Sequence, residues 1–428
     1  MNERSQSRRD FLQNITIAVL TVSAVLLFAQ TQLVSLGEAS PVYRFLAGPD
    51  TASGVVAAVQ QDDILPGVPV RVAAASPYGR YGSVVMTTDD EDYLPLGQLL
   101  TQALSAAQSP ASAAGGAFLT ALERSGTYSV YYDFLSPLPL SILAELAQTA
   151  PLDESVQARR LLLTEENGSV TLYLWDGESR CYRCGTTLSS ADLSGAVGQY
   201  ELGNASFAFE DAMENAGRLA PVSLLPSETP LLPQLSSAAP DTDTSRWLSA
   251  LGFNPNTQNR YRESDTTEVI TESDGRTLRL SPDGTVLYQG GNSTALSLQS
   301  SGDTLTLVEA AGEAQELLND LFATAAGDAQ LYLEQVRQSG AVTVLRFGCH
   351  VNGVPIRPTD GSSAATVTLN GSAVTSLELR IRRYTATETD SPLLPLRQAL
   401  AIAAEGVELS LGYADSGGDT VNAAWLAD

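Results

Sequence analysis

The hydrophobic pattern of the chain begins with one long apolar segment near its N-terminus. Residues 11–37 carry no charged side chain, and residues 15–29 read ITIAVLTVSAVLLFA. A helix rises about 1.5 Å per residue, so residues 11–29 would extend about 28 Å, which is enough to cross the hydrocarbon core of a bilayer. We therefore expect a transmembrane signal-anchor helix over residues 11–33, preceded by a cytoplasmic tail of residues 1–10.

Residues 43–225 show two hydrophobic periods in turn. Alternation in GVPVRVAAAS (67–76) predicts a strand, whereas LGQLLTQALSAAQ (96–108) has the i, i+3, i+4 spacing of a helix. Residues 159–188 predict a meander of three strands, with Asn-Gly and Asp-Gly at its turns. These elements predict an extracytoplasmic N-terminal α+β region.

The second half of the chain carries a repeated pattern. Residues 226–244 are rich in proline and serine, which predicts a linker rather than a packed element. Residues 245–308 and 309–428 each begin with a helical pattern and continue with alternating strands and a late hairpin. The predicted fold class is therefore α+β: the transmembrane helix, the N-terminal region and two tandem helix-plus-antiparallel-sheet modules.

The arginines near the N-terminus admit two interpretations. Arg8 and Arg9 lie in S-R-R-D-F-L, which matches the twin-arginine export signal. The same residues would hold the N-terminus in the cytoplasm if the apolar segment is an anchor. A cleaved signal needs small residues close behind its apolar run, and the best candidate, G-E-A at 37–39, is distant. An uncleaved, single-pass anchor in the cell membrane is favoured, with Arg8 and Arg9 as topology determinants and the bulk of the chain extracytoplasmic.

The expected membrane helix carries a row of small residues. Ala18, Thr21, Ala24 and Ala29 are spaced to share approximately one helix face. Small and hydroxylated residues allow membrane helices to approach closely. This face is predicted to pack against a partner's membrane helix.

The composition is strongly acidic, with 49 Asp and Glu against 24 Lys and Arg and a net charge of −25. Such a surface repels phosphate backbones, so no nucleic-acid partner is expected. All the basic residues are arginines, and His350 is the single histidine. These absences exclude Schiff-base lysines, P-loops and multi-histidine metal sites. We expect a protein that is not an enzyme and has no cofactor and no bound metal.

Three cysteines and the histidine are expected to be structural. Cys181 and Cys184 form one C-x-x-C on a predicted strand, where residues three apart point to opposite faces. A redox or zinc role would need a helix N-terminus or a second ligand pair. His350 follows Cys349 in the strand RFGCHVNGVPI, and we expect it to be partly exposed, on the other face from Cys349.

One local basic cluster stands out from the acidic body. Alternation places Arg380 and Arg382 on one face of a strand, which makes them a candidate contact surface for an acidic partner. Pairing of these arginines with carboxylates of the same chain is the alternative.

Several short motifs resemble the YycH/YycI family, accessory regulators of the WalK–WalR cell-wall two-component system. The family's Y-x-E, L-x-I-x-x-D-G-x-V-x-Y, G-x-P-I, G-x-V-x-S-L and Y-x-D…A-W patterns are matched at Tyr261–Glu263, Leu278–Tyr288, Gly353–Ile356, Ala373–Leu377, Tyr413, Asp415, Ala424 and Trp425. The resemblance is best over about the last 190 residues. It implies a non-enzymatic protein that contacts a membrane sensor histidine kinase, together with a paralogous regulator, through membrane helices and extracytoplasmic domains. No residue-level binding site carries over, because the matched positions are turns and core strands.

Three functional interpretations remain open at this point. The favoured one is a membrane-anchored extracytoplasmic regulator of a sensor histidine kinase. The second is an extracytoplasmic peptide- or glycan-binding module that uses a groove between the two modules. The third, a twin-arginine-exported enzyme, conflicts with the inventory of side chains.

Overall fold

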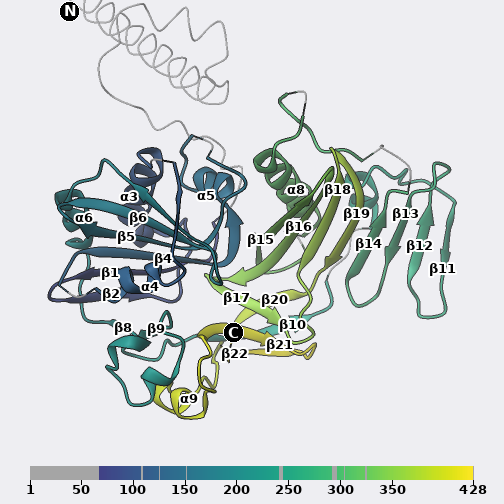
Figure 1. The fold of residues 1–428 in the computed structure, drawn as a ribbon. Coiled ribbons are helices and arrows are strands. Elements are labelled where there is room, and N and C mark those ends of the chain that lie inside the picture. The colour runs from purple at the N-terminus through teal and green to yellow at the C-terminus, as the bar shows by residue number, and fades with distance from the viewer. Residues whose placement is uncertain are drawn as a thin grey trace, which may run out of the picture. The chain divides into compact units, whose positions relative to one another are not determined.

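The computed structural model describes residues 67–427 apart from 108, 125, 151, 241–243, 292–295, 303 and 323–324. Every described residue belongs to one compact unit, Asp63–Asp428. Within that described part, no helix is both long enough and apolar enough to cross a membrane. The expected anchor over 11–33 lies outside the described residues. The described fold is mixed α+β and rich in strands, as the pattern predicted (Figure 1).

The first part of the unit is built on a seven-stranded sheet with the order β2-β1-β4-β5-β6-β7-β3, all of whose pairs are antiparallel. Its strands are β1 (Arg71–Ser76), β2 (Gly79–Ser83), β3 (Ala111–Ala113), β4 (Ser129–Pro139), β5 (Gln157–Glu166), β6 (Ser169–Trp175) and β7 (Cys181–Gly185). The predicted three-strand meander is confirmed as β5-β6-β7. Asn167 and Gly168 both have positive φ (52° and 82°), as the Asn-Gly turn between β5 and β6 requires.

Helices cover both faces of this sheet: α3 (Leu94–Ser105), α4 (Ala117–Leu122), α5 (Leu140–Leu146) and α6 (Ser190–Val197). Because side chains alternate along a strand, neighbouring residues enter different hydrophobic clusters. Val72 and Tyr132 belong to the cluster that contains the buried residues of α3, α5 and α6. Ala73 and Tyr131 belong to the cluster built around Phe118 of α4.

The second part is a 13-stranded sheet ordered β11-β12-β13-β14-β19-β18-β16-β17-β21-β22-β10-β20, with β15 also paired to β16. Its bounds are β10 (Pro233–Ala238), β11 (Arg260–Arg262), β12 (Glu268–Thr271), β13 (Thr277–Leu280), β14 (Thr285–Gln289), β15 (Gln330–Ser339), β16 (Val342–Val351), β17 (Val354–Pro358), β18 (Ala365–Asn370), β19 (Ala373–Arg380), β20 (Arg383–Asp390), β21 (Leu409–Asp415) and β22 (Thr420–Ala427). Only β17 and β21 pair in parallel among these strands. The accompanying helices are α7 (Thr244–Ala250), α8 (Leu307–Phe322) and α9 (Leu396–Ile402).

Three short 3-10 turns and a two-stranded sheet complete the unit: η1 (Glu91–Tyr93), η2 (Ala208–Glu210), η3 (Ala216–Arg218), β8 (Ala205–Phe207) and β9 (Leu224–Pro226).

The structure differs from two expectations about organisation. The expected linker over 226–244 contains β10, which pairs with both β20 and β22. Pro233 is the first residue of that strand, where a missing N–H is tolerated, and Leu235 is fully buried. The expected modules 245–308 and 309–428 both contain a helix and antiparallel strands, but β14 pairs with β19 and joins them in one sheet.

Candidate functional site

Arg380 and Arg382 are the predicted contact residues that the structure describes. Arg380 ends β19 and pairs with the carboxylates of Glu378 (2.9 Å) and Asp360 (3.0 Å). Arg382 donates from Nε to Ser237 Oγ (2.9 Å) and from Nη2 to the carbonyl of Gly418 (2.6 Å). The alternative to a free contact surface, pairing within the chain, is therefore what the structure shows for both arginines.

Both arginines also line one surface pocket, which we call the Arg380 pocket. It encloses about 250 Å³ between the β17–β18 loop, the β19–β20 junction and the end of β21. Asp415 lies in its wall and accepts a hydrogen bond from the hydroxyl of Tyr384 (2.7 Å), as well as pairing with Arg382 (3.4 Å). Arg380, Arg382, Asp360 and Asp415 are already paired, whereas Asp283 accepts a hydrogen bond only from the backbone N–H of Thr285 (2.9 Å). The pocket therefore offers polar surface without a free cation.

Cys349 lines the same pocket, but its thiol is not reactive near neutral pH. Burial raises the pKa of its thiol to about 12, and the nearby carboxylates of Glu334 and Asp415 act in the same direction. The thiol therefore stays protonated near neutral pH, whereas nucleophilic attack requires the thiolate. This pocket contains no activated cysteine nucleophile.

His350 is buried, with 2% of its surface exposed, so the expectation of a partly exposed histidine is wrong. Its Nδ1 accepts a hydrogen bond from the backbone N–H of Gly353 (3.1 Å), and its ring lies near that of Tyr332. Burial lowers the pKa of His350 to about 4. The imidazole is therefore neutral near pH 7 and serves as a core residue.

The cysteines of the C-x-x-C motif point to opposite sides of β7, as alternation predicted. Cys181 belongs to the hydrophobic cluster around α4, and Cys184 belongs to the cluster on the other face. Both are buried and free, and burial raises the pKa of Cys184 to about 11. No group of three or more His, Cys, Asp or Glu able to hold a metal occurs in the described part of the chain.

The most strongly charged feature of the interior is a buried cluster that sequence analysis missed. Arg159 pairs with Asp133 (2.8 Å) and with Glu408 (2.9 Å). Arg71 pairs with Glu408 (2.8 Å), and Arg160 contacts both carboxylates. Burial alone would raise the pKa of Asp133, but Arg159, Arg160 and Arg71 hold it well below its usual range.

This cluster, which we call the Glu408 cluster, connects the two large sheets. Its arginines and Asp133 come from β1, β4 and β5, whereas Glu408 directly precedes β21. The signal in the sequence was the Arg159–Arg160 pair at the head of a strictly apolar strand segment, LLL. Removing Glu408 would leave the buried Arg71 and Arg160 and the half-buried Arg159 with a single carboxylate partner, so the cluster holds the two sheets together.

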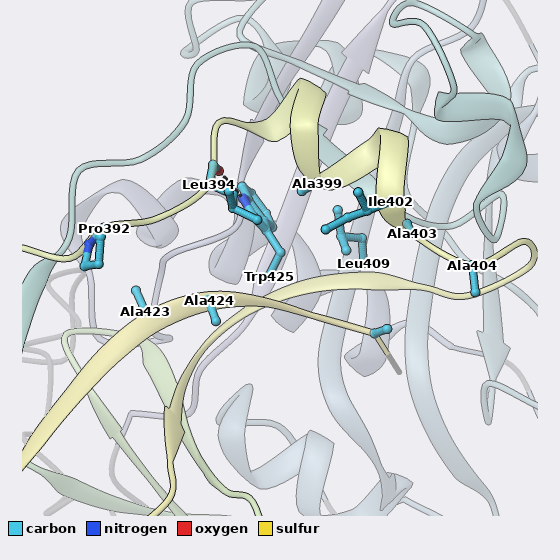
Figure 2. A pocket seen from close by; sticks show the side chains of 11 residues that line it. Pro392, Leu394, Ala399, Ile402, Ala403, Ala404, Leu409, Ala423, Ala424 and Trp425 are labelled. Atoms are coloured by element: carbon cyan, nitrogen blue, oxygen red, sulfur yellow. Dashed lines mark hydrogen bonds between the residues drawn. The ribbon is translucent and has the colours of Figure 1, made fainter. Parts of the chain in front are cut away.

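An apolar groove lies between α9 and the β21–β22 hairpin (Figure 2), and we call it the α9 groove. It encloses about 300 Å³ and is lined almost entirely by apolar side chains, including those of Leu394, Ile402, Leu409 and Trp425. Trp425 is fixed by a hydrogen bond from its Nε1 to the carbonyl of Leu394 (2.9 Å). Figure 2 shows Ile402 on α9, with Trp425 lying between it and Leu394.

Local packing explains why this groove stays open. The helix α9 buries Leu396, Ala399 and Leu400 in a small hydrophobic cluster, and this leaves Ile402 on the other face with 74% of its surface exposed. Leu394 is 45% exposed. The sequence pattern predicted a helix here but gave no sign that its last apolar residue would lack a packing partner.

The remaining predicted residues, Arg8, Arg9, Ala18, Thr21, Ala24 and Ala29, lie outside the described residues. The positions that carry the family resemblance are turns and strands in the described fold, such as the Gly284 turn between β13 and β14. Comparison of the chain with protein-family models, with curated proteins and with solved structures gives no match.

Proposed function

We propose that this chain is a membrane-anchored, extracytoplasmic regulatory protein that binds a membrane sensor histidine kinase and modulates it without catalysing a reaction. The observation that carries this proposal is the α9 groove, with Ile402 and Leu394 exposed on a chain of net charge −25. Contiguous exposed apolar surface on an otherwise highly charged protein is typical of a protein-binding site. The occupant we propose is an apolar segment of the kinase's extracytoplasmic domain.

The chemistry of the described side chains supports a binding role. His350 is neutral and buried, and burial raises the pKa of each cysteine thiol. The Glu408 cluster consists of paired charges, with Asp133 fully buried. None of these groups is poised as a nucleophile or as a general base near neutral pH.

The α9 groove lies next to the Glu408 cluster in sequence, so binding in the groove can affect the rest of the fold. Leu409 lines the groove and is the neighbour in sequence of Glu408, which is held by three arginines of the first sheet. A partner that shifts strand β21 would also shift Glu408 and its ion pairs with the arginines of the first sheet. A regulator acts by favouring one of two conformational states of its partner. A groove that is connected to the rest of the fold through Glu408 would favour one of these states.

Site-directed crosslinking in membranes tests the contact. A photocrosslinker placed at Ile402 of the full chain should capture a sensor histidine kinase, identified by mass spectrometry. The same crosslinker at Leu231, which is 84% exposed but lies outside the groove, is the matched control. Capture of a kinase at Ile402 and not at Leu231 is the expected result. Equal capture at both positions, or no kinase at either, would contradict the proposal.

The Arg380 pocket favours a second candidate function, an extracytoplasmic peptide- or glycan-binding module. Its paired arginines, aspartates and hydroxyls offer both donors and acceptors for a polar ligand. The two functions separate in a thermal-shift experiment on the full chain in detergent. A peptidoglycan fragment that raises the melting temperature, without any kinase captured at Ile402, would favour this second function.

A further inference from the structure

The sequence contains three Asn-Gly pairs, and each lies at a turn between antiparallel strands. Asn167-Gly168 joins β5 to β6, Asn352-Gly353 joins β16 to β17, and Asn370-Gly371 leads from β18 into β19. Asparagine before glycine is the pair most prone to deamidation, because glycine lacks the Cβ that would hinder the approach of its backbone nitrogen to the asparagine side chain. The tripeptides 167–169 and 370–372 are both Asn-Gly-Ser. A difference in reactivity between these two sites must therefore come from the fold.

The hydrogen bonding of the glycine nitrogen separates the three pairs. The backbone N–H of Gly371 donates to the carbonyl of Ala341 (2.9 Å), and that of Gly353 donates to Nδ1 of the buried His350 (3.1 Å). The N–H of Gly168 has no hydrogen-bond partner among the described residues. Two of the three nitrogens must therefore lose a hydrogen bond before they can attack the neighbouring asparagine, whereas the nitrogen of Gly168 need not.

Packing adds a second constraint at one of the pairs. Gly353 is buried, and a Cβ added to it would lie 3.0 Å from backbone atoms of Met86. Asn167 and Gly168 are exposed, and a Cβ added to Gly168 would meet nothing within 4 Å. The space around Gly371 is also open, so the hydrogen bond, and not packing, separates Gly371 from Gly168. The turn between β5 and β6 is thus the one whose opening is least opposed.

We propose that Asn167 is a site of non-enzymatic deamidation in the folded chain and that Asn352 and Asn370 are protected. The backbone nitrogen of Gly168 attacks Cγ of Asn167 and forms a new C–N bond. The bond from Cγ to the side-chain nitrogen breaks, and that nitrogen leaves as ammonia with the proton of the attacking N–H. Water then opens the resulting succinimide at one of its two carbonyls and gives aspartate or isoaspartate. This proposal is independent of the partner proposed above.

The modification would act on the end of the β5–β6 hairpin. Isoaspartate carries the main chain through its side chain and so adds a methylene to the loop. The turn, with positive φ at both Asn167 (52°) and Gly168 (82°), cannot keep its geometry with this longer backbone. Glu166 lies next to the turn and forms ion pairs with Arg124 (3.0 Å) and Arg183 (2.6 Å). Deamidation should therefore loosen these contacts.

Peptide mapping by mass spectrometry tests the proposal. The detergent-solubilised full chain is incubated at mildly alkaline pH, and conversion of amide to carboxylate is followed at each Asn-Gly pair. Asn167 should react at least about fivefold faster than Asn370, because one hydrogen bond has an effect of about this size. In the urea-unfolded chain the two identical tripeptides should react at similar rates. Labelling by an isoaspartate-specific methyltransferase should place the isoaspartate at 167.

The variant Asn167→Gln is the control for the assignment of the modified peptide. Glutamine closes the larger ring much more slowly, so the modified species should disappear from this peptide while Asn352 and Asn370 behave as before. Equal rates at Asn167 and Asn370 in the folded chain would overturn the proposal. So would faster reaction at Asn352 or Asn370, no reaction at Asn167, or a preference for Asn167 that persists in urea.

Discussion

Glu408 is the residue on which the buried charges of the molecule converge. Its carboxylate meets Arg71, Arg159 and Arg160, each of which comes from the first sheet. Burial of a charge is costly unless every partner is present. Single residues of this cluster should therefore affect stability far more than surface charges do.

Replacement of Glu408 by glutamine should be strongly destabilising. The change leaves the buried Arg71 and Arg160 and the half-buried Arg159 opposite Asp133 alone, and loss of one partner from a buried ion pair costs about 3–5 kcal/mol. Urea denaturation followed by circular dichroism would measure this loss. The control is Glu405→Gln, an exposed change expected within about 0.5 kcal/mol of the parent chain. A Glu408→Gln variant as stable as Glu405→Gln would show that the ion pairs of the Glu408 cluster do not stabilise the fold.

The burial of His350 predicts that the folded chain becomes less stable as the pH falls. Its pKa is lowered to about 4 in the folded chain, against an ordinary value of 6.5. Between these values the unfolded chain binds the proton and the folded chain does not, so the free energy of unfolding falls as the pH drops from about 6.5 to about 4. The full loss would be about 3 kcal/mol, at about 1.4 kcal/mol per pKa unit.

The variant His350→Asn isolates this contribution, because His350 is the single histidine and asparagine still offers an acceptor to Gly353. Urea denaturation at pH 5 and pH 6.5 should show a smaller change for the variant than for the parent chain. Identical pH dependence in both would mean that His350 is protonated as readily in the folded state as in the unfolded state.

At the scale of elements, β10 and α9 show how local composition misleads. The prolines around β10 predict a linker, but the strand between them alternates, with Leu235 buried and Ser236 exposed. The helix α9 follows its apolar pattern only in part, since Ile402 projects from the fold. Both elements belong to the region where β22 meets its neighbours, and their roles depend on strands distant in the sequence.

If β10 is a packed strand and not a linker, removing its buried side chain should lower the stability of the folded chain. Leu235→Ala should cost about 2–4 kcal/mol, because it opens a cavity in the core. Leu231→Ala, in the same proline-rich segment but 84% exposed, should change stability by less than about 0.5 kcal/mol. The difference between the urea midpoints of the two variants measures how much the packing of β10 stabilises the fold. Equal midpoints would support the interpretation of this segment as a linker.

How far the sequence predicts this fold depends on the range of each interaction. The β5-β6-β7 meander and the β18–β19 hairpin follow from alternation and from Asn-Gly and Asp-Gly turns, which are local. Fusion of the expected modules by β14 and β19 is a long-range pairing without a local signature. The Glu408 cluster and the α9 groove were missed for the same reason: Asp133 and Glu408 meet only after folding, and an exposed Ile402 looks like any other helical apolar residue. Arg380 and Arg382 do not share a strand face as alternation predicted, because Arg380 ends β19 and Arg382 lies between β19 and β20. Their partners Asp360 and Gly418 lie in other loops.

At the scale of the whole molecule, the described fold forms one compact unit, whereas the anchor remains a prediction from residues 11–33. The proposal joins them: the anchor would hold the folded body at the membrane, where a kinase's extracytoplasmic domain is within reach. Arg8 and Arg9 then set the orientation, because positive charges stay on the cytoplasmic side.

Replacement of both Arg8 and Arg9 by glutamine should disturb this orientation. The expected result is mixed protease accessibility of the body in intact cells, with the N-terminus still present in the mature parent chain. The control, Arg8→Lys with Arg9→Lys, keeps the charges and should keep the orientation while breaking a strict twin-arginine signal. A new N-terminus near residue 40, or loss of export in the lysine variant, would contradict the anchor.

The most direct test of the central claim is kinase activity in a defined membrane. The full chain is reconstituted into nanodiscs with the sensor kinase captured at Ile402, and the rate of autophosphorylation is measured. The account predicts that the chain changes this rate, that Ile402→Glu reduces the change at least about fivefold because it places a charge in an apolar contact, and that Leu231→Glu retains it. An unchanged rate with the parent chain, or equal effects of the parent chain and Ile402→Glu, would contradict the account.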